Sequence, residues 1–180
     1  IMVEEYDKDD FTSQISIRGY KPNETVHEGQ IKRAMEILEK AKKPVFLIGG
    51  GVKISGAKKE LTELAHITQV PVITTVMGRG AIDTDDEMYV GNIGLHGSFA
   101  SNRAIQRCDV LFSIGTRFND RITGKVEEFA KNATIIHIDI EAASISRNIS
   151  VDVPIVADAK LAIKEMLKRA KKCDTKLWRE

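Results

Sequence analysis

The sequence contains little of the residue types that mark several classes of protein. Its 180 residues include two cysteines, Cys108 and Cys173, which lack Cys-x-x-Cys spacing and are too few for a disulfide scaffold. The four histidines show no spacing typical of metal ligands, so we expect no metal site made by this chain alone. No apolar run approaches the length that a bilayer requires, and no signal peptide is evident. We therefore expect a reducing, cytoplasmic compartment and no membrane association.

An excess of one charge is also lacking. Lys and Arg total 27 and Asp and Glu total 26, which leaves a net charge of +1. This balance provides no overall field that would draw the chain to nucleic acid, so any anionic partner must be recognised locally. A length of 180 residues with 42% hydrophobic content suits one well-cored domain. We expect a linker or an arm from a preceding domain at 1–20, a central domain at 21–172, and the start of a linker at 173–180.

The chain does contain a regular alternation of apolar runs and helical periodicity. The apolar runs predict strands at 44–48, 70–76, 109–114, 134–139 and 151–156. Helices are expected at 31–41, 57–65, 98–108, 143–148 and 158–170, with Ser55, Ser98 and Asp158 as caps. Residues 91–97 contain three glycines and are expected to form no regular element. The alternation predicts an α/β fold: a six-stranded, parallel, doubly wound (Rossmann-like) sheet with helices on both faces.

The most informative stretch is 115–125, which follows the predicted strand at 109–114. It carries Arg117, Asp120 and Arg121. Ligands bind open parallel sheets at the carboxyl ends of the strands, and guanidinium groups have donors suited to phosphates and carboxylates. An anionic ligand is therefore expected here. The alternative is that Arg117 and Asp120 only pair with each other on a solvated loop.

Two glycine clusters follow other strands. Gly49, Gly50 and Gly51 would let the backbone approach a diphosphate, with amides at the start of the next helix as donors, although they equally suit a tight turn. In the cluster at 94–97, His96 is either a stacking or hydrogen-bonding group or a structural residue.

Isolated polar residues give weaker signals. Asp139, at a strand end, suits ribose hydroxyls or caps the next segment, whereas His137 is expected in the core. No nucleophile with an adjacent base, no catalytic carboxylate pair and no metal cage is evident in the sequence. The residues indicate a nucleotide binder without a full catalytic set.

Four motifs in this order resemble the central domain of the acetolactate (acetohydroxyacid) synthase large subunit. They are 71–78 (PVITTVMG), 94–97 (GLHG), 115–125 (GTRFNDRITGK) and 137–140 (HIDI). The resemblance covers about residues 19–167. It implies a thiamine-diphosphate enzyme of three α/β domains, the middle one binding FAD that performs no redox step in the main reaction. Such an enzyme decarboxylates pyruvate and adds the two-carbon unit to a second 2-keto acid in branched-chain amino-acid synthesis.

The resemblance also implies roles for individual residues. Arg121 would hold the carboxylate of the acceptor keto acid, and Asp120 would orient Arg121 or border the flavin. The FAD site would be lined by Gly49, Gly50, Gly51, Thr75, Val76, Met77, Leu95, His96, Gly115, Thr116, Arg117, Asn119, Asp139, Ile140, Asp158 and Ala159.

The chain departs from the family pattern in places. Many relatives have Asp at Asn119, Met at Leu95 and Gly-Asp-Val at 157–159, which puts individual flavin contacts in question. The chain also has no Gly-Asp-Gly motif, so the resemblance assigns thiamine diphosphate and magnesium to other domains. We therefore expect an inactive middle domain of a homo-oligomeric enzyme with a possible regulatory small subunit.

Two alternatives remain open. One is the central domain of another thiamine-diphosphate enzyme that binds ADP or no nucleotide, and the other is a free-standing nucleotide-binding module. Arg117, Asp120 and Arg121 together favour the acetolactate synthase family over the first.

Overall fold

A computed structural model describes residues 25–179 of the protein, and the arm expected at 1–20 lies outside this range. The described residues contain one sheet of six parallel strands in the order β3-β2-β1-β4-β5-β6. The strands are β1 (Pro44–Ile48), β2 (Val72–Thr74), β3 (Tyr89–Asn92), β4 (Val110–Ile114), β5 (Thr134–Asp139) and β6 (Val153–Val156). This is the strand order of doubly wound dinucleotide-binding sheets, in which the direction of winding reverses between β1 and β4. The predicted α/β fold with six parallel strands is confirmed.

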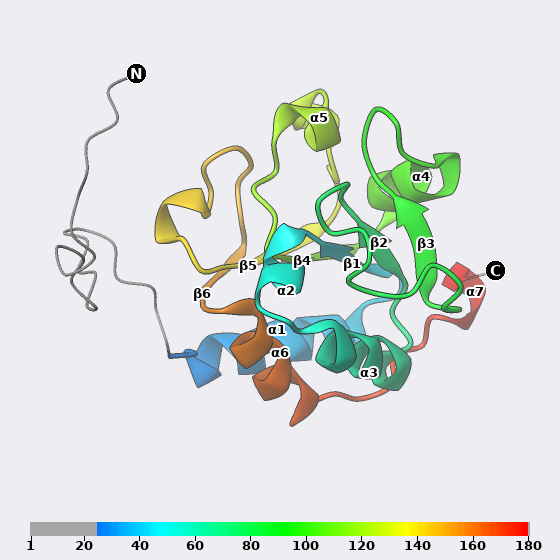
Figure 1. The fold of residues 1–180 in the computed structure, drawn as a ribbon. Coiled ribbons are helices and arrows are strands. Elements are labelled where there is room, and N and C mark those ends of the chain that lie inside the picture. The colour runs from blue at the N-terminus through cyan, green and yellow to red at the C-terminus, as the bar shows by residue number, and fades with distance from the viewer. Residues whose placement is uncertain (1–24, 180) are drawn as a thin grey trace, which may run out of the picture.

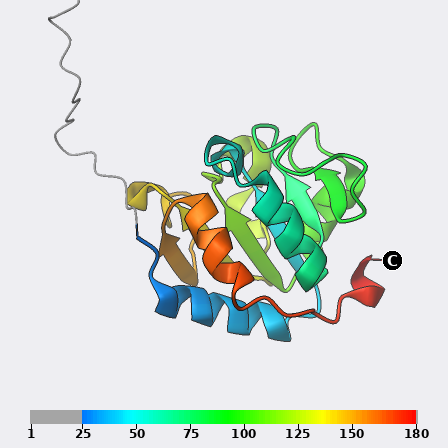
Figure 2. The same ribbon diagram turned by 60° about the horizontal axis from the view of Figure 1, so that its bottom comes forward.

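Helices lie on both faces of the sheet. One face is covered by α1 (Glu28–Lys40), α3 (Lys58–Thr68) and α6 (Ala159–Leu167), which pack side by side (Figures 1 and 2). The other face is covered by α4 (Phe99–Arg107), by the segment that carries α5 (Asp120–Thr123) and the 3-10 turn η2 (Val126–Glu128), and by α7 (Lys176–Arg179). Each face has its own cluster of buried hydrophobic side chains.

The two central strands hold these clusters together. Every residue of β1 and β4 is buried, as expected for strands covered on both faces. Phe46 and Phe112 meet edge to face across the strands, with ring centroids 5.6 Å apart. Burial of each such side chain stabilises the fold by about 1.5–3 kcal/mol. Apolar burial therefore stabilises the sheet strongly at β1 and β4.

The expectation that 91–97 forms no regular element is wrong for its first two residues. Gly91 and Asn92 belong to the edge strand β3, which pairs only with β2 and shifts register beside Val72 and Ile73. Gly91 has φ +140°, and a Cβ at this position would lie 2.8 Å from the Ser98 hydroxyl. Glycine is therefore required by local packing and does not end the strand.

Two helix predictions need correction. Ser55 does not cap the helix after it, because β1 leads directly into a short helix, α2 (Gly50–Ile54), which Ser55 terminates. The helix expected at 143–148 is only a 3-10 turn, η3 (Ala142–Ser144), since Ile145 is extended and Ser146 has φ +57°. The caps at Ser98 and Asp158 are confirmed, because their side chains accept hydrogen bonds from the amides of Ser101 and Leu161 respectively.

The segment expected to start a linker, 173–180, is described up to residue 179 and includes α7. Trp178 Nε1 donates to the carbonyl of Pro44 at 3.0 Å, and the Thr175 hydroxyl donates to the carbonyl of Gln69. Cys173 is buried. These contacts attach the described end of the chain to the start of β1 and the end of α3.

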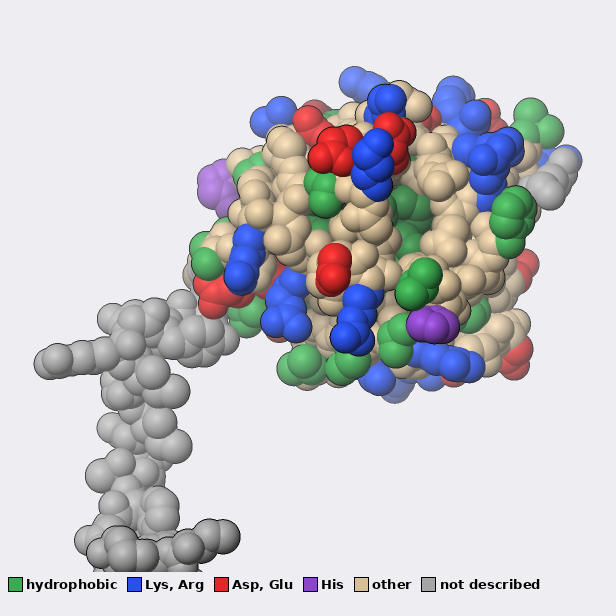
Figure 3. Space-filling model, turned by 90° about the horizontal axis from the view of Figure 1, so that it is seen from above, with side chains coloured by type: hydrophobic (Ala, Val, Ile, Leu, Met, Phe, Trp, Pro, Cys, Tyr) green, Lys and Arg blue, Asp and Glu red, His purple; other side chains and the backbone are tan. Residues whose placement is uncertain are grey.

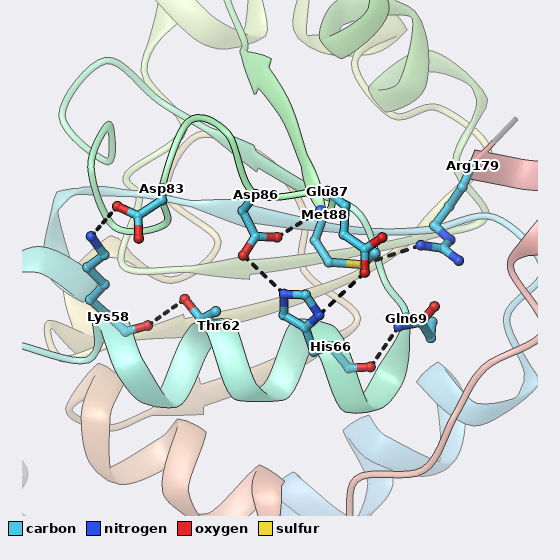
Figure 4. A network of polar contacts seen from close by, with 9 residues as sticks. All are labelled: Lys58, Thr62, His66, Gln69, Asp83, Asp86, Glu87, Met88 and Arg179. Carbon is cyan, nitrogen blue, oxygen red and sulfur yellow. Dashed lines mark hydrogen bonds and ion pairs between the residues drawn. The ribbon is translucent and has the colours of Figure 1, made fainter.

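A polar network joins α3 to the loop at 83–88 (Figure 4). His66 Nε2 lies 3.0 Å from Asp86 Oδ2, and the amide of Met88 donates to Asp86 Oδ1 at 2.8 Å. Burial alone would raise the pKa of Asp86, but the hydrogen bonds from His66 and Met88 outweigh burial and hold this pKa below its ordinary value of 3.8. The ionised carboxylate therefore stabilises the folded state.

This network predicts a pH-dependent effect of Asp86→Asn. A lowered carboxyl pKa contributes stability above the unfolded-state pKa, and this contribution is lost as the pH falls through the folded-state pKa. Urea unfolding should show Asp86→Asn to be less stable than wild type near pH 7, with a difference that shrinks between about pH 5 and about pH 2. Asp85→Asn, at an exposed neighbour, should match wild type throughout. A difference that does not change with pH would contradict this account.

Candidate nucleotide site

A cavity of about 910 Å³ lies at the carboxyl ends of the strands. The loops that follow β1, β2, β3, β4 and β5 and the start of α6 line it, at the upper end of the molecule in Figure 1. Figure 3 looks onto this end and shows hydrophobic and basic side chains interspersed over a hollowed surface. The cavity includes the place where the strand order reverses between β1 and β4, which is the usual ligand position in such sheets.

The cavity brings together nearly all the site residues expected from the sequence. Those that line it are Gly50, Gly51, Thr75, Val76, Met77, Leu95, His96, Gly115, Thr116, Arg117, Asn119, Arg121, Asp139, Ile140, Asp158 and Ala159. Gly49 and Asp120 are not among the lining residues. Asp120 is exposed at the start of α5, and Gly49 lies between the exits of β1 and β4. The role of each residue in binding stays a prediction.

The glycines after β1 permit backbone to pack on backbone. The amide of Gly49 donates to the carbonyl of Ile114, and the amide of Gly51 donates to the carbonyl of Gly115. A Cβ at Gly49 would lie 2.0 Å from the Gly115 carbonyl oxygen, far inside any real contact. The amides of Gly49 and Gly51 are therefore engaged within the protein. Their first role is close packing of the two strand exits, rather than donation to a diphosphate.

The segment after β4 is folded by two residues with positive φ. Gly115 has φ +64° and Phe118 has φ +50°. Phe118 is buried and packs edge to face on His137 and Phe129, at centroid distances of 4.9 and 5.9 Å. Because Phe118 turns into the core, its neighbours Arg117 and Asn119 are left exposed at the cavity.

Hydrogen bonds from other loops hold this segment. Asn148 Nδ2 donates to the carbonyl of Arg117 at 2.8 Å, and the amide of Leu95 donates to the carbonyl of Arg121 at 3.2 Å. Asn102 bonds both the amide and the carbonyl of Gly94 through its side chain. The three loops that follow β3, β4 and β5 therefore form one connected rim.

The guanidinium groups of the site are not neutralised within it. Among residues 25–179, no ion pair involves Arg117 or Arg121, so the alternative in which Arg117 pairs with Asp120 is not what the structure contains. Uncompensated guanidinium groups beside a cavity favour an anionic ligand.

The carboxylates of the site have partly structural roles. Asp139 Oδ1 accepts from the amide of Glu141 at 2.9 Å, but the residue that caps the following 3-10 turn η3 is Glu141, whose side chain accepts from the amide of Ala143. The capping role considered for Asp139 is therefore wrong. Asp158 Oδ1 caps α6 through the amide of Leu161. His137 is fully buried, as expected, and burial lowers its pKa despite opposing effects of the Thr116 carbonyl and Asp139.

Several lining residues escaped the sequence reasoning. They are Ile54, Ser55, Ile93, Gly94, Ile122, Ile138, Glu141, Ser144, Arg147 and Ala157. Gly94 stood inside a recognised motif, and Arg147 is a third cation at the cavity. Arg147 and Ser144 follow the same strand as Asp139, and this position could have identified them as lining residues. The expectation of a helix at 143–148 obscured it.

Residues 25–179 contain no cluster of His, Cys, Asp and Glu arranged to hold a metal ion. Over the same residues, no helix combines the length and hydrophobicity needed to cross a membrane.

The fold and the site together define an open α/β domain with a nucleotide-sized ligand cavity at its switch point. More particularly, the chain belongs to the family described as the central domain of thiamine pyrophosphate enzymes, whose model matches residues 31–166. It is 47% identical over 163 residues, or 91% of its length, to a probable acetolactate synthase large subunit of Methanococcus aeolicus. It is 46% identical over 86% of its length to a probable acetolactate synthase large subunit of Methanocaldococcus jannaschii, and 40% identical over 85% to the acetolactate synthase isozyme 3 large subunit of Escherichia coli.

The matched region is 27%, 26% and 27% of those three proteins, so the chain spans about a quarter of the length of its relatives.

The close packing at Gly49 generates a prediction. Gly49→Ala should lower the free energy of unfolding by at least about 1–3 kcal/mol, because the new methyl group meets backbone that cannot move without opening β1 from β4. Gly29→Ala is the matched control. Its Cβ, in the first turn of α1, would lie 3.1 Å from the side chain of His27, the N-cap of α1, and not from any backbone atom, so the gain in helix propensity offsets any shift of this ring and stability should change far less than in Gly49→Ala. Equal urea midpoints for Gly49→Ala and wild type would contradict the close-packing account.

Proposed function

We propose that this chain is the FAD-binding central domain of an acetolactate synthase large subunit. The observation that carries the proposal is the cavity at the carboxyl edge of the sheet, in which Arg117 and Arg121 face an open volume without carboxylate partners among the described residues. The similarity to acetolactate synthase large subunits over most of the chain supports the same conclusion.

The lining suits a flavin nucleotide in size and chemistry. A cavity of about 910 Å³ falls within the range of cofactor pockets. Exposed apolar side chains of Val76, Met77 and Leu95 offer a surface for a planar ring system, and the guanidinium group of Arg117 suits a diphosphate. Asp139 Oδ2 pairs with no Lys or Arg among residues 25–179, His137 Nε2 lies 3.9 Å away, and this oxygen would accept from ribose hydroxyls.

Arg121 is proposed to serve the substrate. Arg121 is exposed and lines the cavity, and its backbone carbonyl accepts a hydrogen bond from the amide of Leu95 in the loop after β3. A guanidinium group there can bind the carboxylate of a 2-keto acid through two parallel hydrogen bonds, which lysine cannot reproduce. Asp120, its neighbour in α5, would orient Arg121 or border the flavin.

The remaining chemistry is assigned to other domains of the whole enzyme. Thiamine diphosphate, with magnesium, would supply the carbanion chemistry that transfers a two-carbon unit from pyruvate to a second keto acid. This chain's residues would hold the flavin in its non-redox role and help to receive the acceptor. We propose a cytoplasmic homo-oligomer with a possible regulatory small subunit.

Titration of FAD and ADP against the purified 180-residue chain tests the cofactor assignment. We expect FAD to bind more weakly than about 1 μM, because neighbouring domains would supply part of its contacts, and ADP to bind more weakly still. Arg117→Gln should weaken FAD binding by about tenfold or more, the worth of a charge-assisted hydrogen bond. Arg107→Gln, at the end of α4, should leave the affinity unchanged. ADP binding that equals or exceeds FAD binding would favour a relative that holds ADP instead.

The isolated chain should have no acetolactate synthase activity. It lacks the Gly-Asp-Gly motif for thiamine diphosphate, so an assay with pyruvate, thiamine diphosphate, magnesium and FAD should give no acetolactate above the protein-free rate. Turnover by the purified chain without other polypeptides would refute the assignment of the chemistry to other domains.

A further inference from the structure

Two polar side chains are buried next to each other under the cavity, and neither is used by the proposed ligand contacts. Ser113 and His137 occupy paired positions on β4 and β5, and both are fully buried. They lie on the sheet face of Leu111 and Ile135, within the second hydrophobic cluster. Ser113 Oγ and His137 Nδ1 are the buried side-chain atoms without a hydrogen-bond partner in residues 25–179.

The other ring nitrogen defines the protonation of His137. Nε2 lies 2.7 Å from the carbonyl oxygen of Thr116, which can only accept, so Nε2 carries the proton and donates. Burial lowers the pKa of the imidazole, which keeps the ring neutral. Nδ1 therefore presents a bare lone pair to the interior. A lone pair in such a place needs a donor, and the nearest polar group in register is the Ser113 hydroxyl.

We propose that the Ser113 hydroxyl donates to His137 Nδ1, and that this pair positions the Thr116–Arg117 segment of the cavity through the bond from Nε2 to the Thr116 carbonyl. Neighbouring parallel strands lie about 4.8 Å apart, so side chains in register on one face are within reach after rotation of the serine χ1. With the serine bond made, Nδ1 is an acceptor, the proton stays on Nε2, and the Thr116 carbonyl is held. Ser113 and His137 are positioning residues, and their effect on ligand affinity rests on the proposed function.

The contacts of the His137 ring leave the Ser113 hydroxyl as the partner for Nδ1. Among the described residues, the His137 ring packs on the Phe118 ring at 4.9 Å, donates to the Thr116 carbonyl, and has Asp139 Oδ2 at 3.9 Å from Nε2. Asp139 already accepts from the amide of Glu141. Two aliphatic side chains at these paired positions would pack into the hydrophobic cluster, as Leu111 and Ile135 do two residues earlier on the same strands. We therefore explain the presence of a polar pair by its contact with the backbone, because His137 holds the Thr116 carbonyl, which precedes Arg117.

Nuclear magnetic resonance of the imidazole nitrogens tests the bond directly in the 180-residue chain. In wild type at neutral pH, His137 should show a protonated Nε2 and an unprotonated Nδ1 whose ¹⁵N frequency is reduced by an accepted hydrogen bond. The matched variants are Ser113→Val and Ser113→Thr, which add the same volume and differ only in the hydroxyl. Ser113→Val should move Nδ1 to the frequency of a free acceptor, and Ser113→Thr should not. A protonated Nδ1 in wild type, or the same Nδ1 frequency in all three proteins, would overturn the bond.

The amide resonance of Arg117 measures the positioning role, because its nitrogen is bonded to the carbonyl carbon of Thr116. His137→Gln and His137→Asn are the second matched pair, because a glutamine amide reaches the place of Nε2 and an asparagine amide reaches only that of Nδ1. Ser113→Val and His137→Asn should shift the Arg117 amide resonance, and Ser113→Thr and His137→Gln should largely preserve it. An Arg117 resonance unmoved by Ser113→Val and His137→Asn would overturn the positioning role.

Flavin affinity is the consequence for the site. Ser113→Val and His137→Asn should weaken FAD binding roughly two- to tenfold, the range of one neutral hydrogen bond, with the conservative partners near wild type. Equal affinity in all variants, together with wild-type binding, would contradict the link to the ligand. If wild type itself fails to bind FAD, the proposed function fails, while the resonances of Nδ1 and Arg117 still decide the positioning role.

Discussion

The contact between the exits of β1 and β4 is the constraint on which the rest of the site depends. Gly49 and Gly51 donate to the carbonyls of Ile114 and Gly115, and no side-chain atom fits between them. This contact brings the start of α2 against the segment that carries Arg117, at the point where the sheet reverses direction. The loops on either side then diverge, and the cavity is the space between them. The cavity here is a consequence of backbone packing before it is a matter of side chains.

Contacts with the core and with a neighbouring loop hold the segment after β4 that carries Arg117. Phe118 turns into the core with φ +50°, His137 holds the carbonyl of Thr116, and Asn148 holds that of Arg117. A site on a loop supported in this way keeps its geometry before the ligand arrives, which reduces the entropy lost on binding. The exposed apolar side chains beside it, Leu95 and Met77, remain accessible to a ligand or to other domains of a longer protein.

Sequence reasoning predicted the parts of the fold that depend on long apolar runs. The fully buried β1 and β4 are unmistakable because all their side chains except that of Ser113 are apolar, on both faces. It missed β3, where Gly91 is required by contact with Ser98, and it missed α2, because a glycine cluster indicates a turn and a helix start equally well. Most of the site residues that the family resemblance implies line the cavity, and their roles in binding stay predictions. Several other lining residues were not predicted. Arg147 is among them, because its place depends on a left-handed residue, Ser146, that no periodicity reveals.

Hydrogen–deuterium exchange with and without saturating FAD tests the central claim most directly. If the flavin nucleotide lies in the crevice between the strand exits, exchange should slow in residues 49–54, 115–121 and 139–147, whereas α1 and α3, which do not line the cavity, should be unchanged. Exchange that slows in α1 or α3 while the three loops stay unaffected would place the ligand elsewhere and contradict the account.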